Sequence, residues 1–304
     1  MAFFLRGGGL FLTIHLSEMT IHVKSIFFFG ETRYGGFTRG KHLKRKEEMD
    51  GMNQEIAIRT ESLTKRYGEK LAVDHLDLTV AEGEMLALLG VNGAGKTTTI
   101  RMLSGLSVPT EGTAWILGKE VKKEKDAVKR LVGISPQDTA VADNLTVEEN
   151  LKFMAGICLE EKARIQARVE EVLKSFHLEE VRSKRAKTLS GGWKRKLSIA
   201  MAIIGEPKVL FLDEPTLGLD VLARRELWRE IEALKSRMTI ILTTHYMEEA
   251  QALADRIAIM IDGRLEEIGT LEQLEEKTGK QGLEEVFVYV AEQAGNENGS
   301  VKRG

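Results

Sequence analysis

The stretch Gly90-Val91-Asn92-Gly93-Ala94-Gly95-Lys96-Thr97 decides the fold. It satisfies the pattern G-x-x-x-x-G-K-[ST], and it lies between an apolar run at residues 84–89 and a helical segment that begins at Lys96. Glycines let the backbone wrap closely around phosphate, and the N–H groups of a helix start hold its charge. A strand, this loop and a helix in that order predict a phosphate-binding α/β domain, in which Lys96 reaches the β and γ phosphates and Thr97 ligates magnesium.

Short apolar runs alternate with amphipathic segments on both sides of this loop. We expect half-exposed strands at residues 55–60 and 76–80, and buried strands at 84–89, 132–135, 209–212 and 239–242. Helices are expected from residue 96, over 147–176, from Ser190 to 204, and over 222–234. Strands interleaved with helices predict an α/β fold with a mostly parallel sheet.

Composition excludes several classes of protein. The 304 residues carry 44 Lys and Arg against 46 Asp and Glu, and this net charge of −2 provides no overall electrostatic footprint for nucleic acid. The single cysteine, Cys158, cannot form an intramolecular disulfide and fits a reducing compartment. A membrane span needs about 18 consecutive apolar residues, and the sequence contains no such run.

Residues 1–51 differ from the rest of the chain, because they contain seven of its 11 phenylalanines and are basic. We interpret them as a non-native leader or a disordered extension, translated from a misplaced start codon ahead of Met49 or Met52. A membrane-surface anchor is the alternative. The expected phosphate-binding domain covers residues 52–275, and residues 276–304 form a short C-terminal element with a disordered polar tail from Ala291.

Two adjacent carboxylates, Asp213 and Glu214, follow the apolar strand at residues 209–212. Beside a phosphate loop, Asp213 is expected to orient magnesium and Glu214 to hold or deprotonate the water that attacks the γ-phosphate. An acidic strand-to-loop turn, with Asp213 capping a helix, is the alternative without the loop.

A second helix start suited to an anion is Ser190-Gly191-Gly192, preceded by Leu189. With the phosphate loop, the acidic strand and a later histidine in this order, residues 55–274 resemble the ATP-binding cassette (ABC) ATPases. The resemblance implies a P-loop NTPase ABC cassette with a mostly parallel core sheet, an N-terminal antiparallel β subdomain and a helical signature subdomain at about residues 138–190.

The resemblance also implies roles for single residues. Tyr67 would stack on adenine, Gln137 would contact magnesium and the attacking water, His245 would lie at the γ-phosphate, and Asp220 would lie in a loop crossing between subunits. Their alternatives are a packing aromatic, a polar loop residue, a structural histidine and a helix N-cap. The residues implied in ATP binding are Tyr67, Gly90, Asn92, Gly93, Ala94, Gly95, Lys96, Thr97 and Thr98; those implied in Mg²⁺ binding are Thr97, Gln137 and Asp213.

In this family two cassettes enclose ATP between the phosphate loop of one and the Ser190-Gly191-Gly192 equivalent of the other. The resemblance therefore implies a homodimer or a related second ATPase subunit, ATP and Mg²⁺ as ligands, and a separate transmembrane permease that holds the chain at the inner face of the cell membrane.

Several stretches resemble the ATPase subunits of multidrug, antibiotic and lipid exporters, among them residues 132–138, 189–197 and 246–250. An importer ATPase, or a soluble ABC ATPase acting in DNA repair or on ribosomes, is the alternative. One departure from the family is Trp193, where glutamine is usual. We expect residues 194–196 and the 182–187 run to be solvated charges, and no nucleic-acid partner.

Overall fold

The computed structural model describes residues 13–16, 19–22, 55–159 and 161–301, and the chain divides into two units, residues 1–52 and 53–304. In the first unit, strands β1 (Thr13–Leu16) and β2 (Met19–His22) pair antiparallel. The rest of the predicted leader at residues 1–51 lies outside the described residues.

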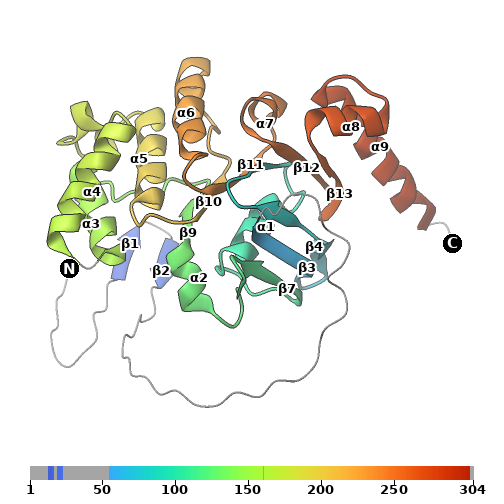
Figure 1. The fold of residues 1–304 in the computed structure, drawn as a ribbon, viewed down its shortest axis with the longest axis horizontal. Helices are drawn as coiled ribbons and strands as arrows, with labels where there is room; N and C mark the ends of the chain where they lie inside the picture. The colour runs from blue at the N-terminus through green and yellow to red at the C-terminus, as the bar shows by residue number, and fades with distance from the viewer. Residues whose placement is uncertain (1–12, 17–18, 23–54, 160, 302–304) are drawn as a thin grey trace, which may run out of the picture. The chain divides into compact units, whose positions relative to one another are not determined.

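A six-stranded sheet in the order β13-β12-β6-β11-β10-β9 forms the centre of the second unit (Figure 1). Its strands are β6 (Met85–Leu89), β9 (Val132–Ser135), β10 (Val209–Asp213), β11 (Thr239–Thr244), β12 (Arg256–Ile261) and β13 (Arg264–Gly269). Strands β6, β9, β10, β11 and β12 are parallel to one another, and β13 pairs antiparallel with β12. The predicted mostly parallel α/β sheet is confirmed.

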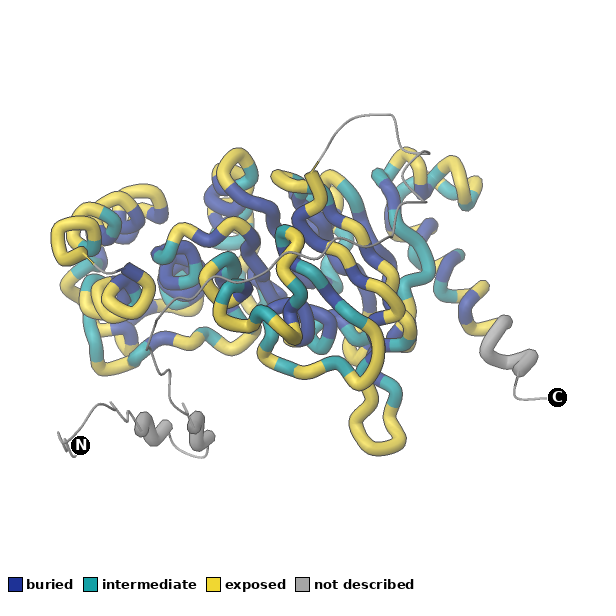
Figure 2. Tube along the Cα trace, turned by 60° about the horizontal axis from the view of Figure 1, so that its bottom comes forward, coloured by how far each residue is buried: buried dark blue, intermediate teal, exposed yellow. Residues whose placement is uncertain are grey.

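Alternate residues of the parallel strands enter two different hydrophobic clusters. In β6, Met85, Ala87 and Leu89 join one cluster, whereas Leu86 and Leu88 join the other. Strands β10, β11 and β12 alternate in the same way. Successive side chains of a strand point to opposite faces, so the sheet is covered on both sides, and the continuous apolar runs of the sequence are explained. Figure 2 shows these strands as a buried centre between exposed loops.

The predicted N-terminal antiparallel subdomain is a second sheet, in which β3 pairs with β4, β5 and β7, and β7 pairs with β8. The strands are β3 (Ile56–Tyr67), β4 (Lys70–Leu76), β5 (Thr79–Ala81), β7 (Glu111–Ile116) and β8 (Lys119–Glu120).

The single strand predicted at residues 76–80 is wrong, because the chain is divided there between β4 and β5. The division is fixed by Thr60 of β3, whose hydroxyl donates to the Leu76 carbonyl at 2.7 Å and accepts from the Leu78 N–H at 2.8 Å.

The helices of the parallel-sheet half are α1 (Lys96–Leu103), α2 (Lys125–Leu131), α6 (Val221–Leu234) and α7 (Met247–Leu253). Between β9 and α5 (Gly191–Ile203), the chain forms α3 (Val147–Cys158), α4 (Lys162–Ser175) and the short turns η1 (Glu179–Val181) and η2 (Ala186–Thr188). This is the segment predicted as the helical subdomain. The single helical stretch expected over residues 147–176 is two helices.

The C-terminal segment consists of α8 (Leu271–Thr278) and α9 (Leu283–Val301), so the disordered tail predicted from Ala291 is wrong as far as Val301. Buried apolar residues recur along α9 at Leu283, Val286, Val290 and Ala294. These spacings of three and four place them on one face, which packs against the body of the domain and extends the helix into the polar segment. Among the helices that the structure describes, none is long and apolar enough to cross a membrane.

Candidate active site

Neighbouring parallel strands deliver the predicted site residues to one edge of the sheet. The adjacent strands β6, β11, β10 and β9 are followed respectively by the phosphate loop, His245, Glu214 and Gln137. Parallel strands end at the same edge, and ligands of open α/β sheets bind outside their carboxyl ends. Residues more than 100 positions apart in the sequence therefore lie around one site.

Glycine is required at two positions of the phosphate loop. Gly95, the residue before α1, has φ of 99°, and a Cβ there would lie 2.5 Å from the Ala72 carbonyl oxygen. A Cβ at Gly90 would lie 2.5 Å from the Met260 carbonyl oxygen. The loop is thus pressed between two other segments of backbone, and larger residues at either position would displace it.

The Lys96 ammonium group is buried and contacts three oxygen atoms. Its Nζ donates to the carbonyl oxygens of Gly90 at 2.6 Å and Val91 at 3.2 Å, and lies 3.3 Å from Oε1 of Glu214. Loop carbonyls therefore fix the ammonium group beside the backbone N–H groups that begin α1.

The acidic end of β10 is held by two threonines. Oδ1 of Asp213 accepts hydrogen bonds from Oγ1 of Thr97 at 2.9 Å and from Oγ1 of Thr243 at 2.6 Å. The next residue, Glu214, has φ of 50°, and its N–H donates to Oγ1 of Thr243 at 3.0 Å. Thr243, which sequence reasoning missed, thus orients both acids; its register opposite Asp213 on the neighbouring strand was the signal that could have identified it.

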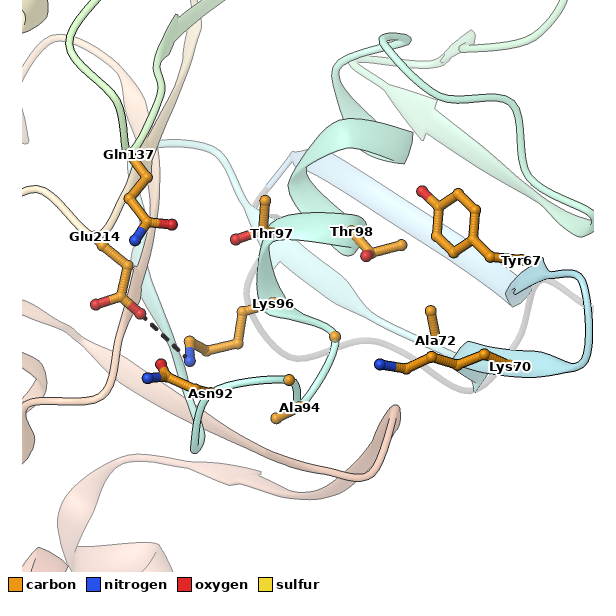
Figure 3. A pocket seen from close by; sticks show the side chains of 12 residues that line it. Tyr67, Lys70, Ala72, Asn92, Ala94, Lys96, Thr97, Thr98, Gln137 and Glu214 are labelled. Carbon is orange, nitrogen blue, oxygen red and sulfur yellow. Dashed lines mark ion pairs between the residues drawn. The ribbon is translucent and has the colours of Figure 1, made fainter.

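A pocket of about 380 Å³ opens in front of these groups (Figure 3). It brings together Tyr67, the loop from Asn92 to Thr98, Gln137 and Glu214. Gly90 contributes its carbonyl oxygen from behind the loop, and His245 contacts Glu214 from the side, with Nδ1 2.6 Å from Oε2.

Two residues of the pocket wall were not identified from the sequence. Lys70 and Ala72 on β4 line the pocket beside the phosphate loop, and Lys70 pairs with Tyr67 in the register of β3 and β4. A lysine three residues after Tyr67, beyond Gly68 and Glu69 at a hairpin turn, was the available signal.

The Ser190-Gly191-Gly192 segment is not among the residues that line this pocket. Ser190 occupies the N-cap position of α5, but its side chain makes no capping hydrogen bond, and both Ser190 and Gly191 are exposed. Asp220 does cap α6, because its Oδ1 accepts from the N–H groups of Leu222 at 2.9 Å and Ala223 at 3.0 Å.

Two of the three basic residues at 194–196 are buried, so the expectation of solvated charges is wrong for Arg195 and Lys196. Helix α5 packs against β9 and β10 on one side and α6 on another, and this leaves no solvent around these positions. The Lys196 ammonium lies 2.8 Å from carboxylates of both Glu226 and Glu230, and 5.0 Å from the Trp193 ring. These ion pairs raise the pKa of Lys196 although burial lowers it.

A second buried acid lies behind the site, on α7. The Glu249 side chain is fully buried, and its Oε1 accepts a hydrogen bond from Nε1 of Trp228 at 3.1 Å. Burial raises the pKa of Glu249, and the charge of Glu214 raises it further. The carboxyl of Glu249 is thus biased toward its neutral form.

The profile of the ABC transporter family matches residues 73–217 of the chain. Over 226 residues the chain is 44% identical to the phospholipid-transporting ATPase ABCA3 of Homo sapiens, a match that covers 74% of this chain but only 13% of that relative. The chain thus spans a small part of the length of this curated relative.

Two solved structures are also similar. The ATP-binding subunit of an ABC transporter has 31% identity and a TM-score of 0.70, with 77% of this chain and 99% of that chain covered. The ATP-binding cassette MJ0796, solved as a dimer in a post-hydrolysis state with ADP and Pi, has 25% identity and a TM-score of 0.64, with 70% and 98% covered.

Proposed function

The chain belongs to the ABC transporter family as an ATPase cassette, and we propose that it dimerises around ATP and drives conformational change in a separate transmembrane permease. The observation that carries the proposal is that Lys96, Thr97 and Glu214 line one pocket, where Lys96 lies 3.3 Å from Glu214. Asp213 is held next to them by a hydrogen bond of 2.9 Å from Thr97. This arrangement combines a phosphate-binding cation, a hydroxyl, a metal-binding acid and a base.

The pocket is suited to a nucleoside triphosphate along its whole length. Tyr67 offers an aromatic face at one end, about half exposed, and the N–H groups of the loop and α1 lie at the other end beside Lys96. We infer that adenine lies over Tyr67 and that residues 92–98 hold the phosphates, with Lys96 at the β and γ phosphates.

The residues present also fit a Mg²⁺ ion. The Thr97 hydroxyl and the Asp213 carboxylate meet at 2.9 Å, and the amide of Gln137 lines the same pocket, which is an all-oxygen set of hard ligands. These three residues would hold the ion together with phosphate oxygens, and the ion would neutralise negative charge on the β and γ phosphates.

Glu214 is the residue we assign to hold and deprotonate the attacking water. Its carboxylate is oriented on both sides, by Nδ1 of His245 at 2.6 Å and by Nζ of Lys96 at 3.3 Å. A carboxylate within hydrogen-bond reach of the reacting water supplies general-base catalysis. His245 keeps that carboxylate in place and lies at the γ-phosphate side of the site.

The second cassette is inferred from the place of α5. Ser190, Gly191 and Gly192 form an exposed helix start that does not line the pocket of their own chain, so the phosphate they bind would belong to a partner. Next to Asp220, the apolar side chains of Val221 and Leu222 are 63% and 79% exposed, which fits an interface in this part of the surface.

We further infer a membrane role, with the chain bound at the inner face of the cell membrane through a permease. The exporter branch handles drug, antibiotic and lipid-like substrates. The relative ABCA3 is named as a phospholipid-transporting ATPase, and this favours a lipid-like substrate. The path of the substrate would lie in the permease.

The test is affinity purification of the Glu214→Gln variant from mildly solubilised cells with ATP present, followed by identification of the co-purifying proteins. Lys96→Ala serves as the matched control, because we expect it to bind ATP weakly. Recovery of a polytopic membrane protein with the first variant and much less with the second supports the proposal. Recovery of ribosomes or DNA-repair factors without a membrane protein would contradict the transport role.

A further inference from the structure

One face of helix α5 contacts strand β9 and the two residues that follow it, Pro136 and Gln137. Near the C-terminal end of α5, a Cβ at Gly133 would lie 2.3 Å from the Ala202 carbonyl oxygen, so the strand and helix backbones are in close contact. One turn earlier, the hydroxyls of Ser198 and Ser135 lie 3.0 Å apart. These contacts recur along α5 at spacings of three and four residues, which is one helix face.

Arg195 makes the contact nearest to the start of the helix. Its Nη1 donates to the Pro136 carbonyl oxygen at 2.7 Å, and its Nη2 donates to the Gln137 carbonyl oxygen at 2.6 Å. The side chain is about 95% buried. Burial lowers the pKa of Arg195, but the charges of Asp213 and Asp138 oppose this effect and favour the cation.

Gln137 lies between two cavities of the molecule. Its side chain lines the nucleotide pocket, and it also lines a second cavity of about 240 Å³ that is bounded by Gly191 at the start of α5, by Arg195, and by residues 217–219. The guanidinium group thus joins the backbone of a nucleotide-pocket residue to the helix whose exposed start faces outward.

We propose that Arg195 is a positioning residue: it fixes the backbone of Gln137 to α5, so that engagement of a second nucleotide at residues 190–192 moves Gln137 in the chain's own pocket. This inference rests on the proposed function, since it requires ATP at the start of α5. It gives each ATP site of the dimer a direct mechanical connection to the other.

Lysine at position 195 would break this connection while keeping the charge. The planar fork of arginine reaches two carbonyl oxygens at once, whereas the single ammonium group of lysine does not span them. A matched control contacts the same helix from α4: Arg168 donates from Nη2 to the Ile203 carbonyl at 2.9 Å and from Nε to the Ile204 carbonyl at 3.3 Å. Arg168→Lys removes the same kind of contact at the opposite end of α5.

The experiment compares the full chain with Arg195→Lys, Arg168→Lys, Gln137→Ala and the Arg195→Lys/Gln137→Ala double variant. We expect Arg195→Lys to lower kcat about 10- to 100-fold, as a displaced catalytic group does, with the Kd for a fluorescent ATP analogue within about twofold of the parent value. Arg168→Lys should keep the parent kcat. Thermal unfolding checks that each variant is folded, and Arg195→Met, which keeps an unbranched side chain but removes every hydrogen-bond donor, provides a second substitution.

The double variant separates positioning from a general structural effect. If Arg195 acts through Gln137, the double variant turns over no more slowly than Gln137→Ala alone. The inference would be overturned if the kcat losses of the two single variants multiply in the double variant. It would also be overturned if the kcat of Arg195→Lys stays within about twofold of the parent, or if Arg168→Lys loses as much kcat as Arg195→Lys. The proposed function is tested separately by the parent chain, which must hydrolyse ATP whatever the variants do.

Discussion

Nδ1 of His245 lies 2.6 Å from Oε2 of Glu214, and the other oxygen of the same carboxylate lies 3.3 Å from Nζ of Lys96. Three residues that follow three adjacent parallel strands are therefore joined through one acid. The backbone of Glu214 is left-handed, with φ of 50°, and its carboxylate lies between His245 and Lys96. A carboxylate held on both sides in this way needs little reorganisation to act as the proposed general base when a water molecule approaches.

The contact between His245 and Glu214 predicts that His245→Ala impairs turnover more than binding. We expect kcat to fall about 10- to 100-fold because the carboxylate loses its orientation, while the Kd for ATP changes little. Steady-state phosphate release and nucleotide titration measure the two effects. Tyr246→Phe is the control, since it keeps the ring that packs on His245 with centroids 4.1 Å apart. Equal loss of activity in both variants would point to damaged packing rather than to the histidine.

Lys96→Ala should weaken ATP binding itself. A charge-assisted hydrogen bond contributes about 1.5–3 kcal/mol, which corresponds to roughly a 10- to 150-fold higher Kd. Isothermal titration calorimetry with ATP measures the change. Lys119→Ala removes an exposed lysine that pairs with Glu124 at 3.3 Å, and it should bind as the parent does. Unchanged affinity in Lys96→Ala would contradict the assigned phosphate site.

The raised pKa of Glu249 predicts a pH-dependent stability that glutamine removes. Between the usual glutamate pKa of 4.5 and the raised native value, the native state keeps a proton that the unfolded state has lost. The stability that Glu249 contributes is therefore present at low pH and is lost as the pH rises through this window, by about 1.4 kcal/mol per unit of pKa shift.

Glu249→Gln keeps an oxygen that can accept from Trp228 but cannot ionise. Relative to the parent, this variant should become more stable as the pH is raised from 4.5 to 8, as measured by urea unfolding at several pH values. A stability difference between the two proteins that stays constant over this range would show that Glu249 does not titrate as its burial requires.

Two substitutions distinguish the cap that Asp220 forms on α6 from its proposed role in a subunit contact. Asp220→Ala removes the cap of α6 and should lower the free energy of unfolding by about 1 kcal/mol, whereas Asp220→Asn keeps a capping oxygen and should retain most of it. Urea unfolding gives the stability, and ATP turnover gives the effect on the proposed subunit contact. Loss of turnover in Asp220→Asn, with stability kept, supports the contact; parent-like turnover in both variants leaves only the cap.

The parallel half of the fold was predictable because its signals are local. Strand β9 lies at the predicted residues 132–135, and α1 begins at the predicted Lys96, since buried strands read as continuous apolar runs between turns. The convergence of Gly90, Gln137, Glu214 and His245 at one edge was predictable as well, because each residue directly follows or lies close behind a predicted strand. The roles of single residues, in contrast, came from the family resemblance.

Other features depended on tertiary contacts that the sequence does not display. The division between β4 and β5 depends on Thr60 of another strand, and the length of α9 depends on a docking surface made by distant residues. Arg195 has the sequence context of a solvated helix charge, and only the position of β9 beside α5 shows that it binds two backbone carbonyls.

The measurement that tests the account most directly is the mass in solution of Glu214→Gln, with and without ATP and Mg²⁺, by sedimentation or light scattering. The account predicts a monomer without nucleotide and twice that mass with ATP, because ATP is captured between the phosphate loop of one chain and residues 190–192 of the other and is not hydrolysed. The Lys96→Ala/Glu214→Gln double variant should stay monomeric under both conditions. A mass that does not change with ATP, in a variant shown to bind ATP, would contradict the central claim.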